Sequence, residues 1–168
     1  MTNLAKNSAI IYQICNRVEP GKKMLQKIMY LITRRGVRLD LDYSIHFFGP
    51  YSAKLDNIVH ILESYDKLFV DTSGSTHIIH LGSVPIEDGL EANDQAIVDY
   101  VLDNFSTRSA FELEAITTID YVANTILNDY NNDEQIIENV QQIKGAKFTR
   151  DYLQDCLNTL RQTHYDDL

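Results

Sequence analysis

One amphipathic segment and the aromatic turn that follows it have the residue types and spacing of a binding surface. Lys23, Lys27, Tyr30 and Arg34 are separated by four, three and four positions. A helix over 22–35 therefore places them on one side. Further along, the chain reads Phe47-Phe48-Gly49-Pro50-Tyr51-Ser52. Because proline fixes φ and restricts the residue before it, Gly49-Pro50 predicts a rigid turn.

The expected turn would hold aromatic side chains beside the start of a helix, where backbone N–H groups lack helical partners. With the nearby lysines, it predicts a pocket for a phosphate or for an acidic side chain of a peptide. The residues expected in this partner-binding site are Lys23, Lys27, Tyr30, Phe48, Gly49, Pro50, Tyr51 and Ser52. The alternative is a tight turn whose aromatic side chains belong to the core, and the sequence leaves both interpretations open.

Motifs of known catalytic chemistry are absent from the sequence. There is no GxxxxGK[ST], GxGxxG, GxSxG or HExxH. His77 and His80 lie three apart on an expected strand, so they point to opposite faces and cannot share a metal ion. His60 lies near Asp56 and Glu63 on an expected helix, and a solvated helix face explains this trio better than a metal site does. We therefore expect no catalytic residue, no metal site and no cofactor.

Composition restricts the classes of function further. The 168 residues are 44% apolar and 23% charged, which is enough for one globular domain. The net charge of −9 excludes a uniformly basic nucleic-acid-binding protein. Residues 1–50 nevertheless hold eight basic and three acidic residues, whereas residues 51–168 hold seven basic and 21 acidic residues. Weak, non-specific binding of nucleic acid is the most that this distribution predicts.

The compartment is predicted from the cysteines and from the apolar segments. Cys15 and Cys156 lie far apart on expected helices without a CxxC context, and we interpret both as small buried hydrophobic residues. No apolar run has the length of a signal sequence or of a membrane span. These features predict a cytoplasmic protein that does not enter a membrane.

The periodicity of apolar residues predicts a helix-dominated α+β fold. A strand is expected at 43–48 and a β-hairpin at 68–81, around the central Gly74. Side-chain N-caps are expected at Ser52, Asn93, Ser109, Asn132 and Thr149. Helices are expected at 4–17, 22–35, 53–66, 93–105, 109–129, 132–144 and 149–160.

Two units are expected from this order of elements. Residues 1–82 would form an α+β unit of helices and a short antiparallel sheet, with a winged-helix-like hairpin. Residues 93–168 would form a helical bundle packed on it, the whole being one compact domain.

Two stretches of sequence resemble the YwgA family of bacterial proteins. The first runs from Lys22 to Tyr30, and the second from His46 to Ser52. Weaker matches follow at 111–114, 117–121, 143–144 and 148–149, so the resemblance covers about 20–160. A more distant resemblance is to the Panacea, or SocA-like, domain of antitoxins and proteolytic adaptors. Gln26, Met29 and Phe48 depart from that domain's pattern. This resemblance implies a small non-enzymatic protein that grips another protein.

Three functions are compatible with these observations. The first is a regulatory protein-interaction module, antitoxin-like or adaptor-like, whose partner is another protein; self-association is left open. The second is a winged-helix DNA-binding regulator, although only one helix separates the expected strand from the hairpin, and that helix carries Asp56, Glu63 and Asp66. The third is a protein that binds or converts a small phosphorylated ligand.

Overall fold

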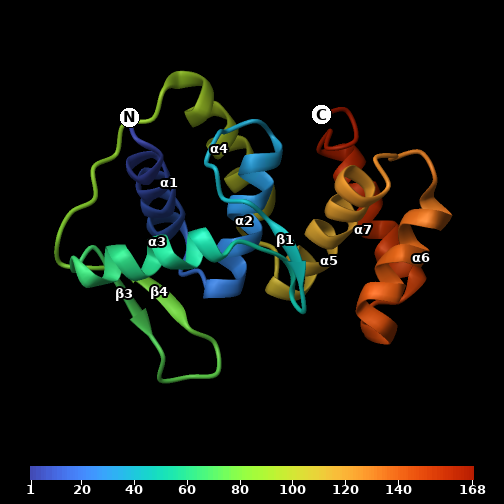
Figure 1. The fold of residues 1–168 in the computed structure, drawn as a ribbon, viewed down its shortest axis with the longest axis horizontal. Helices are drawn as coiled ribbons and strands as arrows, with labels where there is room; N and C mark the ends of the chain where they lie inside the picture. Colours follow the sequence, from blue (N-terminus) through green and yellow to red (C-terminus); the bar gives the residue numbers. More distant parts are fainter. The chain divides into compact units, whose positions relative to one another are not determined.

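The computed structural model describes all residues, 1–168. Seven α-helices and two separate two-stranded antiparallel sheets make up the regular structure (Figure 1), which confirms the expected helix-dominated α+β class. None of the helices combines the length and the apolar character that crossing a bilayer requires. The chain divides into two units.

The first unit comprises residues 1–43 and 52–107. Its α2 is covered on every side, because the eight consecutive residues 25–32 are all buried. α3 and α4 bury one apolar stripe each, whereas α1 buries residues 7–11 in succession together with Ile14. The elements are α1 (Asn3–Arg17), α2 (Lys22–Arg34), α3 (Ala53–Ser64), β3 (Leu68–Asp71), β4 (Ile78–Leu81) and α4 (Ala92–Phe105).

The β-hairpin expected at 68–81 is present as β3 and β4, and it extends away from the helices of the first unit (Figure 1). Phe69 faces His80 across the two strands. The free edge of β4 is paired with the start of α2: Lys22 N–H donates to His77 O at 2.9 Å, and Ile79 N–H donates to Pro20 O at 2.9 Å. These bonds satisfy backbone groups that an open sheet edge would leave exposed.

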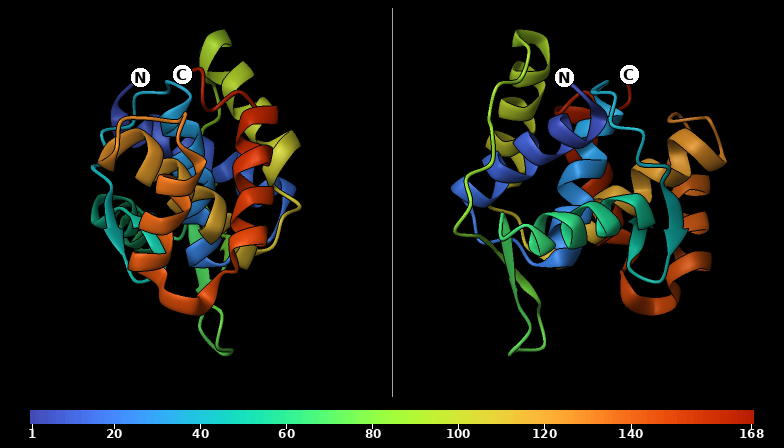
Figure 2. Two further views of the ribbon diagram at one scale, coloured as in Figure 1. Left: turned by 90° about the vertical axis from the view of Figure 1, so that its right-hand side faces the viewer. Right: turned by 60° about the vertical axis from the view of Figure 1, so that its left-hand side comes forward.

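The second unit comprises residues 44–51 and 108–168. Its central helix is α5, in which the eight residues 113–120 are all buried. α5 packs on β2, α6 and α7, and α6 also contacts α7 (Figure 2). The elements are β1 (Ser44–His46), β2 (Gly49–Tyr51), α5 (Ala110–Tyr121), a π-helix (Val122–Ile126), α6 (Asp133–Lys144), a 3-10 turn (Gly145–Lys147) and α7 (Arg150–Gln162).

The boundaries of the two units differ from the expected ranges 1–82 and 93–168. α4 belongs to the first unit, because its apolar stripe packs on α2. The β1–β2 hairpin belongs to the second unit, because β2 packs on α5. Packing of both units into one compact domain stays a prediction.

The N-termini of the helices test the N-caps that were predicted from the sequence. Side-chain oxygens of Ser52, Ser109, Asn132 and Thr149 each accept the backbone N–H three residues later, which confirms four predicted caps. The prediction of a cap at Asn93 is wrong, because α4 begins one residue earlier, at Ala92. Asn93 therefore lies within the first turn of α4, and no side chain caps this helix.

Candidate functional site

The four residues predicted to form a binding surface on one side of α2 have different environments. Lys23 is exposed, whereas Lys27 and Tyr30 are each only 3% exposed. Arg34 is half-buried. The prediction that this helix side faces solvent is therefore wrong at Lys27 and Tyr30. The reason is that α2 is buried around its whole circumference, so its amphipathic pattern does not mark a free face.

Ser52 is held by a buried network rather than presented as a contact residue. The side-chain amide of Gln26 donates to Ser52 O at 2.9 Å, and Ser52 N–H donates to Gln26 Oε1 at 2.8 Å. The Ser52 hydroxyl donates to Leu41 O and accepts from Leu55 N–H at 3.0 Å. Gln26 thus clamps the start of α3 to α2. The sequence shows Gln26 only as a polar residue among mostly apolar neighbours, which does not reveal its partner Ser52.

The segment around Gly49-Pro50 forms a hairpin, not one strand closed by a turn. β1 pairs with β2, Ile45 faces Pro50, and the loop falls at Phe47-Phe48. A strand lies within the expected range 43–48 but ends at His46, and the prediction of a turn at Gly49-Pro50 is wrong. Gly49 has a φ of +96°, which residues with a side chain rarely adopt, so this glycine lets the chain re-enter the sheet directly after the loop. Pro50 is tolerated because both strands are edges.

The hairpin presents two aromatic side chains at its tip. Phe47 is 81% exposed and Phe48 is 38% exposed, and their rings meet edge to face at 4.9 Å. Behind the tip, Gly49 and Pro50 are buried, and His46 packs on Tyr51 at 4.8 Å. The base of the hairpin is therefore fixed while the tip remains accessible.

Two lysines support this tip, Lys144 at the end of α6 and Lys147 in the 3-10 turn that follows. Lys144 Nζ donates to the backbone oxygen of Phe47. Lys147 Nζ lies 5.4 Å from the centre of the Phe48 ring, within the range of a cation–π interaction. Both lysines pair with Glu114 of α5, at 3.7 Å from Lys144 and 2.7 Å from Lys147. Removal from water lowers the pKa of Lys144, although Glu114 opposes the shift.

Further aromatic side chains lie beyond Lys147. Lys147 Nζ is also 5.7 Å from the centre of the Phe148 ring. Phe111, which is 48% exposed, packs on Phe148 at 4.9 Å and on Tyr152 at 5.5 Å. We call the exposed set Phe47, Phe48, Phe111 and Lys147 the Phe47 surface.

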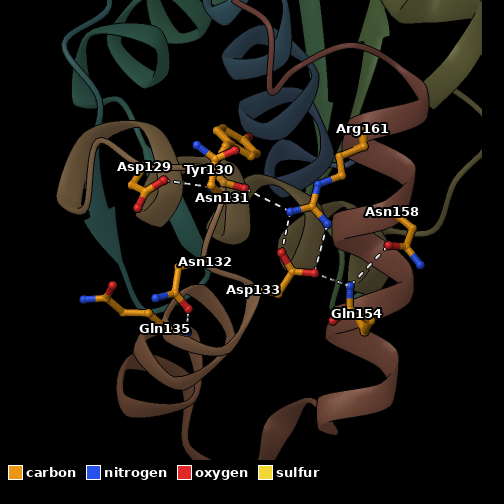
Figure 3. Close-up of polar contacts among 9 residues, drawn as sticks. All are labelled: Asp129, Tyr130, Asn131, Asn132, Asp133, Gln135, Gln154, Asn158 and Arg161. Atoms are coloured by element: carbon orange, nitrogen blue, oxygen red, sulfur yellow. Dashed lines mark hydrogen bonds and ion pairs between the residues drawn. The ribbon is translucent and has the colours of Figure 1, made fainter.

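The position of the supporting lysines depends on how α6 is attached to α7. Arg161 of α7 donates two hydrogen bonds to the carboxylate of Asp133, the first residue of α6 (Figure 3). The bond from Nη1 to Oδ2 measures 3.0 Å. Gln154 donates to the same carboxylate at 2.9 Å, and Arg161 also donates to Tyr130 O at 2.9 Å. The Arg161 hydrogen bonds hold the pKa of Asp133 below its usual value. This clamp fixes the N-terminal end of the helix whose C-terminal end carries Lys144.

The predicted site residues are distributed over both units. Lys23, Lys27, Tyr30 and Ser52 belong to the first unit, and Phe48, Gly49, Pro50 and Tyr51 belong to the second. Convergence of the two groups on one surface stays a prediction. Sequence reasoning missed the contributions of Phe47, Lys144, Lys147 and Glu114. Two lysines close together in the otherwise acidic C-terminal half were the available signal.

The remaining titratable residues give no sign of a metal or thiol centre. No group of three or more His, Cys, Asp or Glu side chains has an arrangement that could hold a metal ion. Cys156 is buried, as expected, and Cys15 is partly buried. Burial raises the pKa of each thiol to about 12, so both stay protonated at neutral pH.

Comparison of the sequence with protein-family models gives no match, and comparison with curated proteins gives none either. The resemblance to the YwgA family and to the SocA-like domain therefore stays a prediction.

Proposed function

We propose that this chain is a non-enzymatic protein-interaction module and that its contact site is the Phe47 surface. The observation that carries the proposal is the 81% exposure of Phe47 at the tip of a supported hairpin. Large apolar side chains are enriched in the centres of protein interfaces. Burying one phenylalanine against a partner stabilises the complex by about 2 kcal/mol.

The tip of the β1–β2 hairpin is held in place by contacts with other parts of the second unit. The loop has only two residues, Lys144 holds its backbone, and Lys147 lies over the Phe48 ring. A contact residue that is already ordered loses little conformational entropy when a partner binds. An exposed aromatic on a mobile loop would lose more. The Phe47 surface is thus organised before binding, as a recognition site should be.

The DNA-binding alternative is less well supported. Lys54 of α3 pairs with Asp42, and Lys22 Nζ lies 3.2 Å from Asp56 of the same helix. Cations neutralised by carboxylates release few counterions from DNA, so they contribute little to affinity. The phosphorylated-ligand alternative remains a hypothesis without an observation that favours it.

The resemblance to antitoxins and proteolytic adaptors suggests the form of this function, which is regulation of a bound partner. We place that activity in the cytoplasm, in keeping with two cysteines that form no disulfide.

Phe47→Ala tests the proposal. Tagged wild-type and Phe47→Ala chains are expressed in the native cells, and co-purified proteins are quantified by mass spectrometry. The removal of about 2 kcal/mol of apolar contact predicts an affinity lower by about 30-fold. At least one protein enriched by the wild type should therefore be lost.

Tyr65→Ala is the matched control, because Tyr65 is 67% exposed and belongs to the first unit. It should retain the partners that Phe47→Ala loses. If both variants retain every partner of the wild type, the Phe47 surface is ordinary solvated surface and the proposal is wrong.

A further inference from the structure

The charges beneath the Phe47 surface do not cancel. Lys144 and Lys147 share one carboxylate, that of Glu114. The side chain of Lys144 is only 3% exposed, and its ammonium group also donates to Phe47 O. The side chain of Lys147 is 34% exposed. The excess positive charge of this triad therefore reaches solvent at Lys147.

We propose, resting on the proposed function, that the Phe47 surface takes a short acidic peptide segment with an apolar anchor. The apolar side chain packs on Phe47 and Phe48, and a neighbouring carboxylate pairs with Lys147. Lys147 Nζ lies 5.4 Å from the centre of the Phe48 ring. Because an extended peptide advances by about 3.3–3.6 Å per residue, its apolar side chain and its carboxylate should lie one or two residues apart.

The charge of the whole chain favours a short segment over larger partners. Residues 44–51 and 108–168 hold five basic and eleven acidic residues, and the chain carries −9 in total. A second copy or an anionic bilayer brings many negative charges against this acidic surface. A segment with one or two carboxylates interacts mainly with charges within the Debye length, about 8 Å at physiological salt. Within that distance, the triad of Lys144, Lys147 and Glu114 carries one net positive charge.

Three labelled peptides test the proposal by fluorescence anisotropy with the full chain. They share a leucine-rich anchor and differ in their flanks, which are glutamate, glutamine or lysine. At about 150 mM salt, the wild type should bind the glutamate peptide at least tenfold more tightly than the lysine peptide. Lys147→Glu should reverse that order, and Phe47→Ala should weaken all three.

Lys54→Glu is the charge-matched control, since Lys54 is an exposed lysine of the first unit, and it should leave the order unchanged. Lys147→Glu places a second carboxylate beside Glu114, so Lys147→Gln is included in case that variant does not fold. Lys147→Gln should abolish the preference for the glutamate peptide over the lysine peptide without reversing it. Circular dichroism verifies the fold of each variant.

Two kinds of result would overturn the inference. If Phe47→Ala loses a cellular partner but no Lys147 variant alters the order of the peptides, the acidic segment is wrong while the proposed function stands. If none of the peptides binds, or if phosphatidylserine vesicles bind the wild type in a Phe47-dependent way, the partner is not an acidic peptide. Loss of the proposed function itself would instead appear as cellular partners indifferent to Phe47→Ala.

Discussion

At the scale of a residue, two lysines four positions apart on α2 show that neighbouring elements determine whether a side chain is exposed. Lys23 is exposed, whereas Lys27 is 3% exposed. Helical spacing correctly places them on one side of α2. Spacing carries no information on what packs against that side, so the burial of Lys27 was not predictable from the sequence.

We predict that Lys27→Glu strongly destabilises the protein. Reversing a buried charge leaves it without compensation, and such changes cost about 3 kcal/mol or more. Lys23→Glu on the same helix should change the free energy of unfolding by less than about 0.5 kcal/mol. Urea titrations of both variants measure the difference. Equal unfolding midpoints for the two would show that Lys27 is accessible in solution.

Local signals identified four of the five predicted N-caps correctly, the exception being Asn93. Ser52, Ser109, Asn132 and Thr149 cap helices because a cap needs only its own side chain and a backbone N–H three residues later. The pairing of Gln26 with Ser52 joins positions far apart in sequence, and no local pattern indicates it.

At the scale of an element, helices were easier to predict than interruptions and hairpins. The expected helix over 109–129 contains a π-helical segment, in which Leu127 N–H donates to Val122 O at 2.8 Å. Apolar periodicity does not reveal a single extra residue in a turn. The β1–β2 hairpin was missed because Gly49-Pro50 has the composition of a turn, although it lies within a strand.

The clamp between α6 and α7 predicts a pH dependence of stability. Because the hydrogen bonds from Arg161 lower the pKa of Asp133 in the folded state, its stabilising effect is fully present above the unfolded pKa, about 3.9. It is lost as the pH falls through the lowered folded value. Asp133→Asn should therefore be less stable than the wild type at pH 7, and the difference should shrink below about pH 3.9.

Urea titrations across that pH range test this prediction, with Glu138→Gln as the control on the same helix. Glu138 is an exposed carboxylate of α6, so its removal should leave the pH profile close to that of the wild type. A constant difference between the wild type and Asp133→Asn at every pH would show that the ionised carboxylate does not hold α6 on α7.

At the scale of the whole molecule, the division into units follows packing rather than chain order. Residues 44–51 lie between α2 and α3 in sequence, yet they belong with α5, α6 and α7. The packing of residues 44–51 in the second unit brings Phe47 and Phe48 beside Lys144 and Lys147, which lie about a hundred positions later in the sequence. The class of fold was predictable from element order, whereas the Phe47 surface depends on this long-range pairing and was not.

Site-specific photocrosslinking can show whether the Phe47 surface contacts a partner protein in the cell. Phe47→p-benzoylphenylalanine introduces a photoreactive ring of similar character at the hairpin tip, and Tyr65→p-benzoylphenylalanine serves as the matched position in the first unit. Irradiation in the native cells should link position 47, and not position 65, to a partner that co-purifies with the wild type. If that partner co-purifies with both chains but crosslinks to neither, or to position 65 alone, the Phe47 surface is not the contact site.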